Sequence, residues 1–160
     1  MKEALLLAVA IYMLAGATIY AGVLTTVVLF LYPSWKTLRP ETIPGQFTIP
    51  IGAATRFFKA AIPTWTVALV VLLVNEWGDR TVWPVLVALF GLVAAAAVFV
   101  LLIRPVNLRI QAGPDQSELP VLMGKWMKLN TIRWAATVVM WVGMCWYFVA
   151  KGDLLAAMKG

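Results

Sequence analysis

The stretch "TVWPVLVALFGLVAAAAVFVLLIR", residues 81–104, decides the fold class of this chain. Residues 82–103 carry no charged side chain, and almost all of them are apolar. An α-helix needs about 20 mainly apolar residues to cross the hydrocarbon core of a bilayer. Pro84 falls in the first turn of such a helix, where proline is tolerated, and Arg104 closes the stretch. Residues 82–103 are therefore predicted to form a transmembrane helix.

Three further segments of the chain are also long and apolar. They cover residues 4–32, 57–74 and 122–150. The first begins like a signal peptide, but its apolar run is longer than the ~7–15 residues of a typical signal core, so we interpret it as a retained span. The sequence thus predicts an all-α fold, an integral membrane four-helix bundle, that forms a single transmembrane domain over residues 1–160.

The composition supports a membrane location and argues against several other classes. Of the 160 residues, 62% are apolar and only 12% are charged, whereas soluble domains have about 25% charged residues. The chain has no His and a single cysteine, Cys145. We therefore expect no internal disulfide, metal site or other cofactor, because haem, zinc and copper sites normally use His or several Cys. The net charge of +6 comes from cations that flank apolar segments, so the expected partner is the lipid bilayer and not nucleic acid.

The distribution of Lys and Arg predicts an orientation in the cell membrane. Cytoplasmic loops carry an excess of these residues. Loops 33–56 and 104–121, with their flanks, carry nine of the 13 cations, and the termini and the short loop 75–80 carry the other four. The prediction is a multi-pass cell-membrane protein with loops 33–56 and 104–121 in the cytoplasm and both termini outside.

The stretch "GKWMKLNTIRW" places several polar side chains at the start of the last span. At about 100° per residue, Asn130 and Arg133 lie within about 40° of Trp126 around the helix, whereas the two lysines of this stretch point elsewhere. A lipid-facing Arg or Asn is costly, so Trp126, Asn130 and Arg133 are expected to face the bundle interior. The two lysines are interpreted as anchors at the membrane surface.

A second polar element, "RPVNLRI", follows the third predicted span. We expect Pro105 to end that span, Asn107 to satisfy backbone groups in the following turn, and Arg104 to lie at the interface. In the first long connection, Pro44-Gly45 is typical of a type II turn. The candidate ligand-binding residues are Trp126, Asn130, Arg133, Arg104 and Asn107. No catalytic residue is assigned.

Two short motifs in these elements resemble the bacterial branch of the anthrone oxygenase family. The first is Pro-x-Asn at Pro105 and Asn107, and the second is Trp-x-x-x-Asn-x-x-Arg at Trp126, Asn130 and Arg133. The resemblance implies a small four-helix membrane protein, in a branch whose members mostly have no assigned function. For the fungal branch it implies oxidation of anthrones to anthraquinones without a metal or flavin. Fungal relatives often carry a His where this chain has Asn130, so the chain lacks the most obvious general base for that chemistry.

Three hypotheses for the function follow. The first, which we favour on the sequence, is an accessory or structural subunit that packs in the bilayer beside other membrane proteins. The second is a binder of a hydrophobic quinone-like or lipid ligand, which requires a cavity at the cytoplasmic end lined by Trp126, Asn130 and Arg133. The third is a cofactor-free oxygenase of anthrone-type aromatic substrates. The expected partners are accordingly the bilayer and either other membrane subunits or a hydrophobic ligand.

Overall fold

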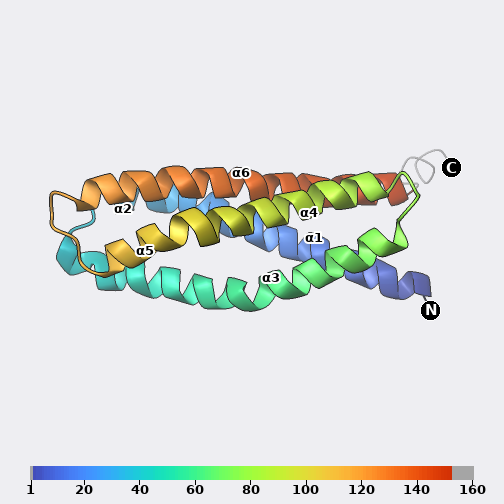
Figure 1. The fold of residues 1–160 in the computed structure, drawn as a ribbon, viewed down its shortest axis with the longest axis horizontal. Helices are drawn as coiled ribbons and strands as arrows, with labels where there is room; N and C mark the ends of the chain where they lie inside the picture. The colour runs from blue at the N-terminus through green and yellow to red at the C-terminus, as the bar shows by residue number, and fades with distance from the viewer. Residues whose placement is uncertain (1, 153–160) are drawn as a thin grey trace.

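A computed structural model describes residues 2–152 and shows four long helices that run antiparallel to one another (Figure 1). Each is long and apolar enough to cross a membrane, and the described residues contain no strand. The four helices have the bounds Lys2–Trp35, Pro44–Asn75, Val82–Gln111 and Leu119–Lys151. The predicted all-α, four-helix membrane fold is therefore confirmed.

Three of the four long helices are composite, because each contains a short π-helix, which interrupts the first and third helices and begins the second; the fourth is α-helical throughout. In chain order the elements are α1 (Lys2–Thr26), the π-helix η1 (Val27–Leu31), α2 (Tyr32–Trp35), the 3-10 turn η2 (Pro40–Thr42), the π-helix η3 (Pro44–Thr48), α3 (Ile49–Asn75), α4 (Val82–Ala97), the π-helix η4 (Val98–Ile103), α5 (Arg104–Gln111) and α6 (Leu119–Lys151).

Each π-helix lies directly before an X-Pro pair, and its wider turn accommodates the proline ring. Pro33, Pro50 and Pro105 each stand two residues after the end of a π-helix. A proline inside an α-helix lacks a backbone donor, and its ring clashes with the carbonyl four residues earlier. In η4, the N–H of Arg104 donates to the carbonyl of Phe99, five residues back, and η1 and η3 repeat this pattern. The wider turn makes room for the ring, so the helix continues through the proline.

This continuation corrects three predictions about the connections. Pro105 does not end the third span, and Asn107 lies within α5 instead of in a turn. Pro44-Gly45 lies in η3, at the start of the second long helix, and not in a type II turn. Proline is tolerated in the first turn of a helix because its missing N–H would have no partner there. A pattern that is typical of turns therefore also occurs where a helix begins.

The predicted loops 33–56 and 104–121 are consequently far shorter than expected. After α5 only residues 112–118 connect to α6, and Gly113 there has a φ of 76°, which glycine adopts without strain. Phe47 and Ile110 are both 0% exposed. Burial of these large side chains stabilises the helical extensions, which form one end of the bundle.

Helix α6 packs against both α1 and α4, and α3 completes the ring by contacting α1 and α4. The main chains of α4 and α6 approach closely at two glycines. A Cβ atom on Gly91 would stand 2.5 Å from the nitrogen of Met140, and one on Gly143 would stand 2.7 Å from the nitrogen of Ala88. Small residues at helix crossings are the usual way for membrane helices to gain close packing.

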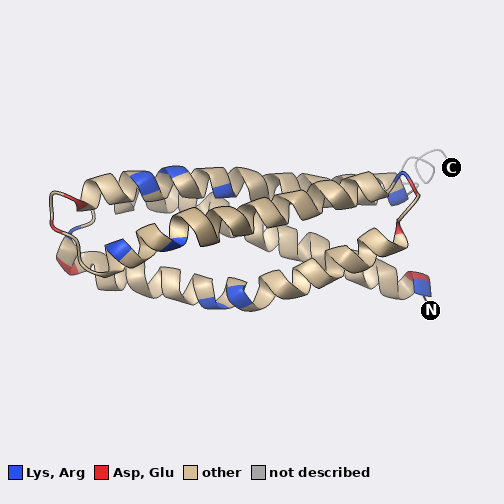
Figure 2. Cartoon of the chain, viewed as in Figure 1, with Lys and Arg blue, Asp and Glu red and all other residues tan. Residues whose placement is uncertain are grey.

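Charged residues lie toward the two ends of the bundle and leave an uncharged stretch between them (Figure 2). At the far end of the uncharged middle, counted from the end where α1 begins and α6 ends, the first cation of each of three helices is Lys59, Arg104 or Arg133. The helical rise from Glu76 to Lys59, or from Lys151 to Arg133, is about 26 Å, which is close to the ~30 Å of a hydrocarbon core. These three cations therefore mark one boundary of the membrane.

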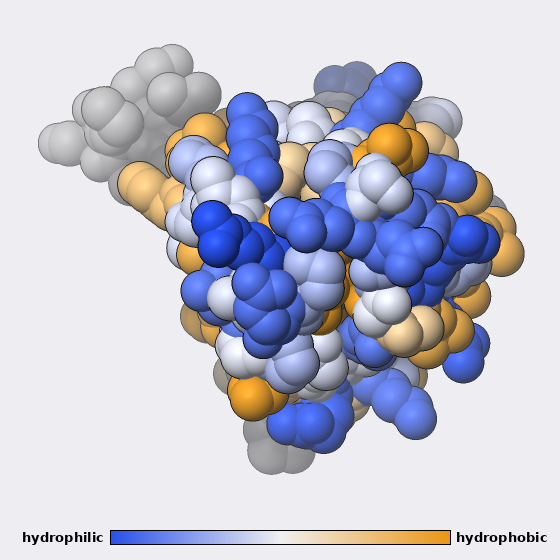
Figure 3. Space-filling model, turned by 90° about the vertical axis from the view of Figure 1, so that its left-hand side faces the viewer, coloured by the Kyte–Doolittle hydropathy of each residue, from blue (hydrophilic) through white to orange (hydrophobic). Residues whose placement is uncertain are grey.

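Beyond this boundary the bundle continues as a polar end. The surface seen from that end is covered mainly by hydrophilic side chains, and apolar ones are concentrated toward its rim (Figure 3). By contrast, large apolar side chains such as Val67, Phe90 and Val142 are exposed along the middle of the bundle, where lipid would cover them. The start of α1 and the end of α6 lie at the opposite end (Figure 1).

Candidate functional site

A cavity of about 610 Å³ lies at this membrane boundary, between α3 on one side and η4–α5 on the other. Figure 1 shows that α3 and α5 approach each other toward the polar end of the bundle. Residues of α1, η1 and α6 complete the wall. The volume lies within the ~300–1,000 Å³ that is typical of sites for one small molecule. The cavity brings together all five candidate residues: Trp126, Asn130, Arg133, Arg104 and Asn107.

Arg133 is a buried cation on α6 and is only 7% exposed. Its Nε and Nη2 atoms donate hydrogen bonds to the hydroxyl of Tyr20, at 3.1 and 2.9 Å. Its guanidinium carbon lies 4.6 Å from the ring centroid of Phe99, 5.2 Å from that of Tyr20 and 5.8 Å from that of Phe58. Within residues 2–152, no carboxylate forms an ion pair with it. One hydroxyl and three aromatic rings therefore hold this charge.

Two polar atoms remain available on the cavity side of α6. The amide nitrogen of Asn130 donates to the carbonyl of Trp126 at 3.0 Å, which fixes the amide orientation, but its Oδ1 has no hydrogen-bond partner among the described residues. The same holds for Nη1 of Arg133. Every fully buried side-chain nitrogen or oxygen in the described residues has a partner, so these two atoms must keep some open surface. Both residues line the cavity, which therefore presents one donor edge and one acceptor.

Trp126 joins the wall formed by α6 to the wall formed by α5. Its indole N–H donates to Oδ1 of Asn107, and the tryptophan is only 2% exposed. Its ring packs edge-on against Tyr32, Trp35 and Phe47, with centroid distances of 5.9, 5.2 and 5.2 Å. This aromatic cluster holds the wall of the cavity in place at its polar end. Asn107 accepts the hydrogen bond of the Trp126 indole and does not cap a turn, as the sequence had suggested.

Two exposed cations, Lys59 and Arg104, line the cavity together with the buried Arg133. No Asp or Glu is among the described residues that line it. The remaining lining side chains are mostly apolar. The cavity therefore combines an apolar wall with a positive charge excess at the membrane boundary.

Sequence reasoning missed four side chains of this site, namely Tyr20, Phe58, Phe99 and Lys59. The three aromatic residues lie in apolar segments, where nothing in the pattern separates an inward ring from a lipid-facing one. Lys59 could have been found from the sequence, because it is the first charged residue along its helix when the helix is followed from its uncharged, membrane-spanning part. Its position matches those of Arg104 and Arg133 on the neighbouring helices.

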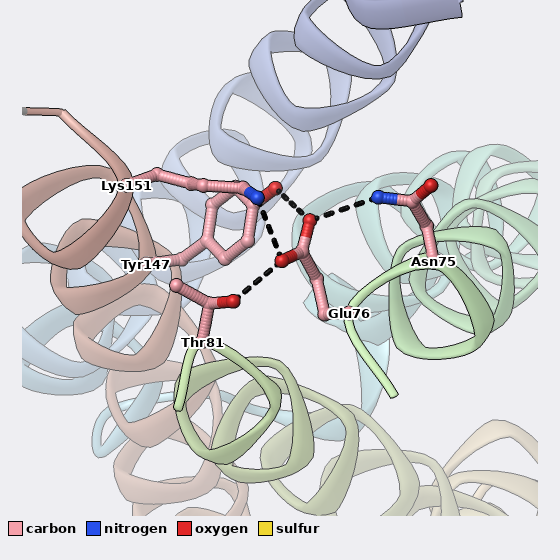
Figure 4. A network of polar contacts seen from close by, with 5 residues as sticks. All are labelled: Asn75, Glu76, Thr81, Tyr147 and Lys151. Carbon is pink, nitrogen blue, oxygen red and sulfur yellow. Dashed lines mark hydrogen bonds and ion pairs between the residues drawn. The ribbon is translucent and has the colours of Figure 1, made fainter. Parts of the chain in front are cut away.

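At the opposite end of the bundle, Glu76 forms a buried polar network that the sequence did not indicate (Figure 4). Its carboxylate lies 2.8 Å from Nζ of Lys151 and accepts a hydrogen bond from the Thr81 hydroxyl. Tyr147 and Asn75 also donate to it, each at 3.1 Å. Burial raises the pKa of the Glu76 carboxyl, but the surrounding donors, Lys151 first, outweigh this effect and hold the pKa below its ordinary value. All its bonds go to protein groups, so this network ties α3, α4 and α6 together.

The chain matches no protein-family model, no curated protein and no solved structure. Within residues 2–152, no group of three or more His, Cys, Asp or Glu side chains comes together as a metal site would require.

Proposed function

We propose that this membrane protein binds a hydrophobic small molecule with a polar head in the cavity beside α6. The observation that carries the proposal is the buried Arg133, which faces the cavity without a carboxylate partner among the described residues. A buried charge is costly unless it is paired or fully hydrogen-bonded. The open Nη1 atom supplies a place for that missing partner.

A purely structural role explains this arrangement less well. The network around Glu76 also borders a cavity, but its charge is paired with Lys151 and its carboxylate accepts three further hydrogen bonds, as expected for groups that hold helices together. Arg133 and Asn130 instead keep one polar atom each toward an open volume. The geometry thus favours a ligand site over the accessory-subunit interpretation, which stays a prediction to be tested by co-purification of partner subunits.

The proposal can be tested with decylbenzoquinone, a neutral quinone that quenches tryptophan fluorescence. In nanodiscs, the wild-type protein is expected to show a saturable component of quenching, because Trp126 lines the cavity. Ala96 also lines the cavity, so Ala96→Phe should fill it and remove that component. Ala97→Phe is the matched control, since Ala97 is exposed on the same helix. Equal saturable quenching of Ala96→Phe and wild type would refute a ligand site here.

A second candidate function is the cofactor-free oxidation of an anthrone to an anthraquinone. It is favoured by one observation: the hydrogen bond from Trp126 to Asn107 joins the two motifs that resemble the anthrone oxygenase family, and both face the same cavity. The reaction consumes one O2 per anthrone and releases one water. Oxygen uptake with an anthrone should be lost in Asn130→Ala and kept in Lys128→Ala, an exposed position on the same helix. Absence of uptake by the wild type would exclude this candidate.

A further inference from the structure

The geometry points to an anionic amphiphile as the ligand of this cavity: a hydrocarbon chain with a carboxylate or phosphate head, the head lying among Lys59, Arg104 and Arg133. This inference rests on the proposed function and names the chemical class of its ligand.

The charges around the cavity are of one sign. Lys59, Arg104 and Arg133 come from three different helices, and the described lining residues include no carboxylate to neutralise them. The described acids that do form ion pairs are engaged elsewhere, Glu118 with Arg109 and Glu76 with Lys151. An anionic head would supply the missing negative charge, whereas a neutral carbonyl would leave the three cations of the lining without one.

The depth of the three cations matches the depth of an amphiphile's head in a bilayer. Each is the first Lys or Arg reached along its helix from the hydrocarbon side, so they lie near the level of lipid head groups. For Lys59 and Arg104, which are exposed, anchoring at the interface is a sufficient explanation by itself. It does not explain Arg133, which is buried and directed into the cavity.

The cavity continues from Lys59 and Arg104 toward the bilayer centre along an apolar wall. On that side of these two cations it is lined by Ile62 of α3 and Ala96 of α4. Toward the polar end its lining reaches Gln111, so it extends over a helical rise of about 20 Å along the third long helix. An elongated, apolar volume with cations along it fits a chain with a charged head better than a compact ring system.

Brominated amphiphiles provide a direct test, because bromine quenches tryptophan on contact. Wild-type protein in phosphatidylcholine nanodiscs is titrated with 9,10-dibromostearic acid at neutral pH, with the corresponding dibromo alcohol, and with a brominated alkyl phosphate. The acid and the phosphate are expected to bind at least about tenfold more tightly than the alcohol, the effect of one charge-assisted hydrogen bond. The anion that binds more tightly then shows whether the head group of the ligand is a carboxylate or a phosphate.

Variants localise the head group. Arg133→Gln should weaken the binding of the acid at least about tenfold and leave binding of the alcohol unchanged. Lys128→Gln removes the same charge from an exposed position of α6 that does not line the cavity, and it should bind as the wild type. If Arg133→Gln does not fold, Lys59→Gln and Arg104→Gln, both at exposed positions, should each weaken the acid severalfold.

The outcomes separate this inference from the proposed function. Equal affinity for acid, phosphate and alcohol, together with saturable quinone quenching, would overturn the anionic class and keep the ligand site. Loss of acid binding in Lys128→Gln to the same extent as in Arg133→Gln would likewise overturn it, since net charge alone would then be responsible. Failure of every probe, quinone included, would overturn both.

Discussion

Replacement of Gly91 by Ala tests whether the contact between α4 and α6 holds the bundle together. The added Cβ would stand 2.5 Å from the nitrogen of Met140 and 2.7 Å from the carbonyl oxygen of Ala136. Both atoms belong to the main chain, so no flexible side chain can move aside. Ordinary van der Waals contact begins at 3.4 Å. The two helices must therefore separate locally by about 0.9 Å, the difference between 3.4 and 2.5 Å.

The magnitude follows from two opposing effects. Alanine favours a helix over glycine by about 1 kcal/mol. Overpacking of a well-packed contact costs about 1–3 kcal/mol, and the rigid main-chain partners place Gly91→Ala in the upper part of that range. We therefore expect the free energy of unfolding to fall by about 1–2 kcal/mol.

The assay is reversible unfolding in mixed micelles at increasing mole fraction of sodium dodecyl sulfate, followed by far-UV circular dichroism. Gly22→Ala is the matched control, because that helical glycine has nothing within 4 Å of the added Cβ. It should leave the free energy of unfolding unchanged or raise it by up to about 1 kcal/mol. If Gly91→Ala were as stable as Gly22→Ala, the close approach of α4 and α6 would not be a stabilising feature, and the reasoning would fail.

Three further predictions concern the polar groups. Glu76→Gln should reduce the free energy of unfolding by about 1–3 kcal/mol in the same assay, because it breaks the ion pair with Lys151 and weakens three hydrogen bonds. The pKa of Glu76 is lower in the folded state than its ordinary 4.5. The contribution of its ionised carboxylate to the free energy of unfolding is therefore present above pH 4.5 and is lost as the pH falls through the folded pKa. The acid-induced loss of stability should accordingly be smaller in Glu76→Gln than in the wild type. Trp126→Phe should cost about 1–3 kcal/mol by leaving Oδ1 of the buried Asn107 without its donor, and Trp77→Phe, at an exposed tryptophan, should cost little. Tyr20→Phe removes the hydroxyl that accepts both donors of Arg133, so it should lower the thermal unfolding midpoint of the ligand-free protein and increase the stabilisation given by an added anionic amphiphile.

The stripe on α6 could be predicted from the sequence because that helix is regular. Trp126, Asn130 and Arg133 are all buried, at the angles that a period of about 3.6 residues assigns to them, and Thr137 continues the same face. Because an Arg or Asn that faces lipid is costly, the stripe could be expected to face the interior of the bundle. Nothing in that argument could indicate whether the stripe would meet protein or an open volume, since this depends on the spacing of the other helices.

The interrupted helices could not be predicted in the same way. Pro105 and Pro44-Gly45 are typical signals for the end of a helix or for a turn, but Pro105 lies inside the third long helix and Pro44-Gly45 begins the second. A π-turn accommodates a proline without ending the helix, and single-sequence patterns do not distinguish the two outcomes. Glu76 was missed for a related reason, because it stands in a short connection where a charged side chain normally faces water.

The π-helices also explain why the cavity lies where it does. Each π-turn takes up one residue more than an α-turn, so side chains beyond it are rotated by about 100° relative to an uninterrupted helix. Asn107 follows η4, and only in this shifted phase does it face Trp126 on the uninterrupted helix α6. Val27 of η1 and Phe99 of η4 line the cavity itself, so the irregular turns lie at the level where Arg133 is buried. A regular α-helix through residues 98–107 would turn Asn107 away from Trp126 and break the link between α5 and α6. The prolines that obscured the boundaries of the helices in the sequence thus help to position the polar wall of the site.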